Sequence, residues 1–368
     1  MRKLSARFTQ TLGIALALSV VVCAGQTESS VPGKTAEQVY KNVQVLKSTQ
    51  ADQLISAMQF ISASLGVRCD HCHDEHAFDK DDKKPKQAAR QMIQMVMALN
   101  QDSFQGKREV TCYSCHRGSL RPATIPAVAT ETTMPKKATT SAEPSRSAEA
   151  VLAAFLWASG GEAALQKIKT EVEKGAIDLG RGVQFPVEIY IKSPASRTVV
   201  THLPTGESLD VVNGNSGWSL VPGRSLLALN TSELLAAHVD ADLQFPANVK
   251  TMFSIEAQPD ETIDGRPVNV LRASGPAQPP VELYFAADSG MLVRMVRYLE
   301  SPLGRYPTQI DYSDYRDVED TKVAFRRTIA QPQGRYVIQI EQLQRNVPVD
   351  DSKFAKPERP PTGDSGPK

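Results

Sequence analysis

The chain has 368 residues, of which 41% are hydrophobic and 23% charged, and its formal net charge is +1. This length is sufficient for two domains with separate cores. The near-neutral charge excludes a strong overall preference for nucleic acid or for acidic partners. After the N-terminal segment no stretch is apolar enough to cross a bilayer, so we expect the mature chain to be soluble or peripheral to a membrane.

The N-terminus has the pattern of a secretory signal peptide. Three basic residues precede an apolar run at 12–24 that ends in small residues, the order typical of a leader that is removed on export. We predict a signal peptide at 1–25 and a periplasmic location. Cys23 leaves open the alternative of a lipid-bearing cysteine, although Val22 is bulky for that motif.

Residues 26–122 predict a small helical domain. Apolar residues recur at helical spacing over 51–65, where Gly66 marks the end, and over 86–100. Each helix is followed by a loop and a Cys-x-x-Cys-His pentapeptide, so the unit repeats this order twice. The basic residues between the pentapeptides are interrupted by aspartates and predict a solvated loop leading into a helix rather than a docking patch; they are Lys80, Lys83, Lys84, Lys86 and Arg90.

The two pentapeptides, at 69–73 and 112–116, hold every cysteine outside the signal peptide. Two thiols separated by two residues can each form a thioether to one vinyl group of the same porphyrin, and the following histidine then ligates the iron. We therefore predict two covalently bound c-type haems. The attaching residues are Cys69, Cys72, Cys112 and Cys115, and the axial histidines are His73 and His116.

Other chemistry for these residues stays open. Two Cys-x-x-Cys pairs can hold zinc through four thiolates, and each pair can form a redox disulfide. Neither alternative uses the two following histidines, and a redox motif is expected at a helix N-terminus rather than after a helix. His71 and His76 are alternative iron ligands, and of these His76 would reach the second haem.

A linker separates the helical domain from the rest of the chain. Residues 123–146 are rich in Pro, Thr, Ala and Ser without hydrophobic periodicity, which predicts an extended connection. The last residues, 356–368, are rich in Pro and Gly and predict a disordered tail.

Residues 147–355 predict an antiparallel β half-barrel-like domain with N-terminal helices. The helical pattern covers 147–174 and is broken at 159–161. Alternation of apolar and polar residues then predicts strands separated by turn residues; these runs are 187–191, 281–285, 292–298, 310–315, 321–328 and 336–343. The fold class is thus multidomain, with a small helical dihaem domain followed by an α+β domain.

The first domain resembles the cytochrome c subunit of photosynthetic reaction centres. This resemblance is carried by the first pentapeptide, by Met58 and Asn100, and by the segments 40–46, 89–95 and 110–118. Proteins of that family are multihaem and periplasmic, and a helix against each haem usually supplies a methionine as second axial ligand. By position, the resemblance implies the methionine ligands Met58 for the first haem and Met95 for the second, with Met92 and Met97 as the other methionines of the second helix.

This sequence also departs from that family. The family commonly carries four haems, whereas this chain has two motifs and no histidine between Asn100 and Cys112, where the family places a further ligand. The pattern is similar to two-haem electron carriers of non-phototrophic bacteria. The second domain more loosely resembles the half-barrel of lipoprotein-sorting proteins, through 158–161 and the alternating strands, which bears on fold alone.

We therefore expect an electron carrier and not an enzyme. Its partners would be a redox donor and acceptor, with a membrane-bound electron-transfer complex as a candidate and no role for nucleic acid. A haem oxidoreductase would require an iron with an open sixth position. The second hypothesis is a haem-bearing sensor whose β domain binds a lipid or a partner protein, because a simple carrier does not need so large a second domain.

Overall fold

The computed structural model describes residues 33–74, 77–122, 124, 143–180, 182–223, 226–243, 246–249, 254–275, 279–332 and 334–358. The predicted signal peptide with Cys23, the residue His76, most of the linker and the tail from 359 lie outside this set. Within the described residues, no helix has the length and apolar character needed to span a membrane.

The N-terminal unit is helical, as expected. Its helices are α1 (Ala36–Val39), α2 (Leu54–Leu65), α3 (Lys84–Phe104) and α4 (Cys112–His116), with single turns at η1 (Ala51–Gln53) and η2 (Cys69–His71). Gly66 ends α2 in the left-handed region at φ 67°, where a residue without a side chain is favoured. Helix α3 begins earlier than predicted because Pro85 suits its first turn.

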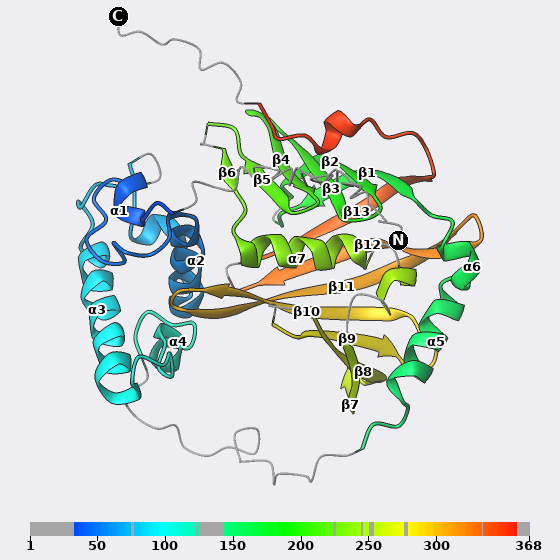
Figure 1. Cartoon of the computed structure of the whole chain (residues 1–368), viewed down its shortest axis with the longest axis horizontal. Coiled ribbons are helices and arrows are strands. Elements are labelled where there is room, and N and C mark those ends of the chain that lie inside the picture. Colours follow the sequence, from blue (N-terminus) through cyan, green and yellow to red (C-terminus); the bar gives the residue numbers. More distant parts are fainter. Residues whose placement is uncertain are drawn as a thin grey trace, which may run out of the picture.

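The second unit is built on one antiparallel sheet of thirteen strands. Their order across the sheet is β6-β5-β4-β3-β2-β1-β13-β12-β11-β10-β9-β8-β7 (Figure 1). The strands are β1 (Thr170–Asp178), β2 (Gln184–Lys192), β3 (Ser196–Leu203), β4 (Gly206–Asn213), β5 (Ser216–Leu220), β6 (Leu227–Ala228), β7 (Ser254–Ile263), β8 (Arg266–Ser274), β9 (Val281–Ala286), β10 (Leu292–Ser301), β11 (Gly304–Val318), β12 (Thr321–Gln331) and β13 (Gly334–Arg345). The predicted fold class is confirmed: a helical region followed by an antiparallel open sheet.

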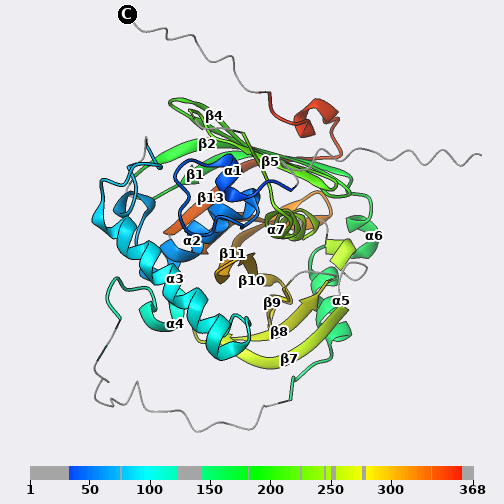
Figure 2. The ribbon, with the colours of Figure 1, turned by 60° about the vertical axis from the view of Figure 1, so that its left-hand side comes forward.

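The sheet bends around its own helices. Figure 2 shows its two ends curling to either side of α7 (Thr231–Asp242), while α5 (Ala148–Ala158) and α6 (Glu162–Leu165) line one flank. Apolar residues of α5 and α7 share one core cluster with the inward residues of the strands. Two further turns, η3 (Pro246–Asn248) and η4 (Asp351–Phe354), complete the domain.

The helical prediction for 147–174 is wrong at its end, because Thr170–Asp178 is strand β1. Glu171 and Glu173 point into the core from this strand and are at most 1% exposed. They pair with Arg345 and Arg327, respectively, from β13 and β12. Charged residues at alternate positions do not show as a strand in a hydrophobicity pattern. Only the arginines, distant in sequence, make their burial tolerable.

The sequence pattern also missed α7 and several strands. The runs of alternation did not include β3, β4, β5, β7 or β8, although turn residues flank them. Helix α7 has an N-terminal capping box formed by Asn230 and Glu233, but its apolar residues do not follow a clear helical stripe. Packing inside the curved sheet therefore defines this helix more than its own pattern does.

The helical unit docks against the closed end of the β10–β11 hairpin and the start of α7 (Figure 1). Phe60 of α2 lies so close to Gly304 that a Cβ there would collide with its ring. The hydroxyl of Tyr306 donates to Gln59 Oε1 at 2.6 Å. Arg108 pairs with Glu300 at 3.0 Å. Leu299, Leu303 and Tyr306 thereby join the apolar cluster of the helical unit.

Candidate functional site

The first pentapeptide follows α2 directly and forms a tight turn. Cys69 is exposed and Cys72 half-buried. Nδ1 of His73 lies 3.0 Å from the carbonyl oxygen of Phe78. Because a carbonyl oxygen only accepts hydrogen bonds, Nδ1 carries the hydrogen and the lone pair of the ring is on Nε2. Metal-binding histidines are commonly oriented in this way, by a hydrogen bond from the ring nitrogen that does not bind the metal. Burial lowers the pKa of His73, which favours the neutral, ligating form.

Buried and half-buried cations hold the loop around this histidine. Lys86 Nζ donates to the carbonyl oxygens of Phe78 at 2.9 Å and Lys80 at 2.7 Å. Lys83 Nζ donates to the carbonyl of His73 at 2.8 Å. The expectation of a solvated loop is therefore wrong for Lys86, which is 8% exposed. The hydrogen-bond partners of Lys86 are backbone carbonyl groups of the irregular loop, and no sequence pattern indicates them.

Asp81 joins these cations into one network. It accepts both guanidinium branches of Arg90 at 2.9 Å and pairs with Lys86 at 3.0 Å. The amide of Asn42 also donates to it, at 3.0 Å. Hydrogen bonds from these groups hold the pKa of Asp81 well below its usual range, so the network keeps its negative partner.

The second pentapeptide forms the short helix α4. Thr111 precedes it and forms a capping box with Ser114, which satisfies free N–H groups of the first turn. Cys112 is buried and Cys115 exposed. Nδ1 of His116 lies 2.9 Å from the carbonyl oxygen of Ser119. The same tautomer therefore results, with Nε2 as the available ligand.

Asn100 supports the second pentapeptide from helix α3. Its side chain is buried, donates to the carbonyl of Val110 at 2.7 Å and accepts from the N–H groups of Glu109 and Val110. These bonds fix the chain immediately before Cys112. Asn100 is among the residues that carry the resemblance to reaction-centre cytochromes, but the sequence assigned it no role; the structure shows this one.

The fold brings the two pentapeptides together. The N–H of Gly118, just after the second motif, donates to the carbonyl of Ser64 near the end of α2 at 2.9 Å. A Cβ on Gly66 would collide with the carbonyl oxygen of Gly118. Glycine at 66 therefore permits both the left-handed turn and this close approach. Two groups attached to these motifs would lie near each other.

The methionines lie on the helices that flank the motifs. Met58 is half-buried in the apolar cluster of the helical unit. Met95 is 50% exposed and shares one side of α3 with Met92 and Leu99, at a spacing of three and four residues. Met97 lies on the opposite flank of the buried stripe. The assignment of Met58 and Met95 as iron ligands stays a prediction.

The helical unit has the surface expected of a haem-binding domain. Ten of the fourteen large hydrophobic residues that are exposed in the described chain lie between 33 and 122. They include Phe78, Tyr113 and Leu120 beside the two motifs and the methionines of α3. Burial raises the pKa of the thiols of Cys72 and Cys112, which keeps them neutral. The donor set of paired thiols, oriented imidazoles and apolar side chains fits a porphyrin with an iron centre.

The placement of these residues bears on one of the alternatives, zinc held by four thiolates. Among the described residues, no three His, Cys, Asp or Glu side chains converge in a way that could hold a metal ion on their own. The four thiols of a zinc ribbon would have to do so. His71 is half-buried within the first motif.

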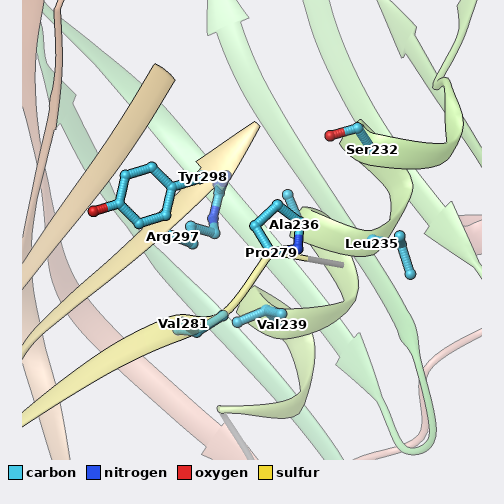
Figure 3. Close-up of a pocket in the computed structure, with 8 residues that line it drawn as sticks. All are labelled: Ser232, Leu235, Ala236, Val239, Pro279, Val281, Arg297 and Tyr298. Atoms are coloured by element: carbon cyan, nitrogen blue, oxygen red, sulfur yellow. The ribbon is translucent and has the colours of Figure 1, made fainter. Parts of the chain in front are cut away.

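Two small cavities lie in the described part of the β domain. One, of about 10 Å³, lies between Ser232 and Val239 of α7 and Arg297 and Tyr298 of β10 (Figure 3). The other, of about 50 Å³, lies near Phe155, Tyr312 and Arg327. Arg297 is held by both carboxylate oxygens of Asp240 at 2.9 Å. The guanidinium group that lines the first cavity is thus already paired.

Comparison with known proteins supports the cytochrome resemblance of the N-terminal region. Residues 10–167 match the family model described as photosynthetic reaction centre cytochrome C subunit. The subunit from Thermochromatium tepidum is 33% identical over 108 residues, which are 27% of each chain. Cytochrome c-554 from Chloroflexus aurantiacus is 35% identical over 85 residues, 21% of this chain and 20% of that protein. The chain spans about a quarter of the length of these relatives.

Solved structures similar to the second domain include proteins of the lipoprotein-sorting type. A LolA superfamily protein from Nitrosomonas europaea covers 58% of this chain and 99% of its own, with 15% identity and a TM-score of 0.41. An outer membrane lipoprotein-sorting protein domain from Vibrio parahaemolyticus covers 53% and 93%, with 10% identity and a TM-score of 0.40. The observed strand order, rather than these scores, defines the fold.

Proposed function

We propose that this chain is a periplasmic dihaem c-type cytochrome, exported by a signal peptide, that carries single electrons between a donor and an acceptor protein. The observation that carries the proposal is the matched geometry of the two motifs. In each, a pair of cysteines precedes a histidine whose Nδ1 is bonded to a backbone carbonyl 3.0 or 2.9 Å away. Neither Nε2 has a hydrogen-bond partner among the described residues.

Each of the predicted site residues would have a defined role in holding a haem. Cys69 with Cys72, and Cys112 with Cys115, would each attach one haem, and a bound haem supplies a one-electron iron couple. His73 and His116 would hold the irons from one side, with Met58 and Met95 proposed on the other. The chain then contributes ligation, apolar surroundings and fixed histidine orientation.

The close approach of the motifs supports transfer within the unit. Because Gly66 and Gly118 are in contact, an electron received at one centre could pass to the other without a substrate. We propose that a redox protein or a membrane-bound electron-transfer complex then accepts it. The similarity to reaction-centre cytochromes supports redox partners of this kind.

The intact mass and absorption spectrum of protein matured in a host that attaches c-type haem test this proposal. We expect the mass of two haems and a reduced-minus-oxidised spectrum of c-type haem. The double variant Cys69→Ser with Cys72→Ser should lose one haem and keep the other. Colourless protein without added mass would contradict the proposal and leave zinc binding as the leading explanation.

Binding of carbon monoxide separates a carrier from an enzyme. If both irons have a methionine as sixth ligand, the reduced protein should keep its spectrum under carbon monoxide. Rapid formation of a carbon monoxide adduct at one haem would instead indicate an open iron and favour a haem oxidoreductase.

A further inference from the structure

The two histidine-binding carbonyls are not equivalent. The carbonyl oxygen of Phe78 lies 3.0 Å from His73 Nδ1 and 2.9 Å from Lys86 Nζ. The carbonyl oxygen of Ser119 lies 2.9 Å from His116 Nδ1. In the described part of the chain, no lysine or arginine accompanies His116 on that oxygen. One histidine therefore shares its acceptor with a buried cation and the other does not.

Positive charge dominates the surroundings of His73. Lys86 is 8% exposed, and its salt-bridge partner Asp81 is shared with Arg90. Lys83 Nζ, from the turn before α3, donates to the backbone carbonyl of His73 itself. Three cations thus face this segment with one carboxylate between them. The other described acidic residues between His73 and α3 are exposed and screened by water; they are Asp74, Asp79 and Asp82.

We infer that Lys86 is a positioning residue that raises the reduction potential of the first centre above that of the second. The inference rests on the proposed function. An Nδ1–H bond to a carbonyl increases the basicity of a ligating imidazole. A cation on the same oxygen withdraws electron density and weakens that effect. Its charge, held in a site of low dielectric, also favours the state that has gained an electron.

The potentiometric titration of the full haem-bearing chain tests this inference. In Lys86→Gln, one midpoint potential should fall and the other should stay constant. We expect about a tenfold change in the ratio of reduced to oxidised first centre at fixed potential, or about 59 mV for a one-electron couple. Lys86→Arg should keep the potential near that of the unaltered protein, because it retains the charge.

Two further variants separate charge from structural damage. Lys84→Gln removes an exposed lysine from the same turn of α3 and should leave both potentials unchanged. Asp81→Asn removes the compensating carboxylate and should raise the potential of the first centre. Asp81→Asn and Lys86→Gln should therefore shift the potential of the first centre in opposite directions.

Some outcomes of these titrations would overturn the inference, and one would refute the proposed function. Equal potentials in Lys86→Gln and the unaltered protein, or equal falls at both centres, would overturn the inference. A fall in Asp81→Asn would do the same, even if Lys86→Gln did not fold. Protein that binds no haem in any variant would instead refute the proposed function, because no midpoint potential could then be measured.

Discussion

Met58 is the one methionine in α2 and lies half-buried against the apolar cluster that also contains Cys112 of the second motif. If it ligates the first iron, Met58→His should lower one reduction potential by more than about 59 mV, a tenfold change, because imidazole stabilises the ferric state more than a thioether does. A redox titration followed by absorption measures this shift. The control is Met97→His, because Met97 lies on the other side of the buried stripe of α3 from Met95. Unchanged potentials in Met58→His would reject Met58 as a ligand.

Glu233 is a half-buried carboxylate at the contact between the two domains. Its side chain accepts from the N–H of Asn230 at 3.0 Å, and the amide of Asn230 donates to the carbonyl of Asp52 in the helical unit. Burial raises the pKa of Glu233 to about 7, and the charges of Asp52 and Asp210 add to this rise. The charge of Glu233 in turn adds to the rise that burial causes in the pKa of Tyr306. The folded state therefore holds a proton there more tightly than the unfolded chain does.

This pKa predicts how stability depends on pH. Because the pKa is raised on folding, Glu233 should destabilise the protein progressively as pH rises from about 4.5 to about 7. The loss should not exceed about 3 kcal/mol. In Glu233→Gln this part of the pH dependence of unfolding should vanish, as measured by urea titration at each pH. Glu37→Gln, on exposed α1, is the control, and the same pH slope in Glu233→Gln and the unaltered protein would contradict the prediction.

At the scale of elements, the β10–β11 hairpin holds the helical unit. Since a Cβ at 304 would collide with the ring of Phe60, Gly304→Leu should separate the domains. Small-angle X-ray scattering should show a larger radius of gyration, while the β signal in circular dichroism should be retained. Gly334→Leu is a matched control, because Gly334 has open space around its Cα and also begins a strand after a turn.

A second substitution tests whether the collision is the cause. Phe60→Ala in the Gly304→Leu background removes the ring and should restore the compact dimension. If Gly304→Leu alone scatters like the unaltered protein, the hairpin contact does not hold the domains together.

At the scale of the whole molecule, two small cavities lie in the described part of the curved sheet. The two cavities described, about 10 and 50 Å³, are far below the roughly 300 Å³ of a small-molecule site. We therefore expect native mass spectrometry of the full chain to show no retained lipid. A co-purifying lipid that survives desalting would favour the alternative of a lipid-binding sensor.

How much of the structure could be predicted from the sequence depends on how far apart in the chain the interacting residues are. The two pentapeptides, the helix that ends at Gly66 and the turn residues of the hairpins depend on neighbours within a few positions, so local chemistry was enough to find them. The antiparallel fold class followed from alternation in strands such as β2 and β10 for the same reason.

Contacts between distant residues decided the rest. Glu171 and Glu173 are strand residues because Arg345 and Arg327 meet them across the sheet, and Lys86 is buried because a folded loop offers it two carbonyls. Sequence by itself predicted haem attachment, since the proposed chemistry requires only short spacing. The tertiary structure alone decided which carbonyl orients each histidine, which charges surround it, and that the helical unit rests on the β10–β11 hairpin, because free energy from burial and pairing acts between groups far apart in the chain.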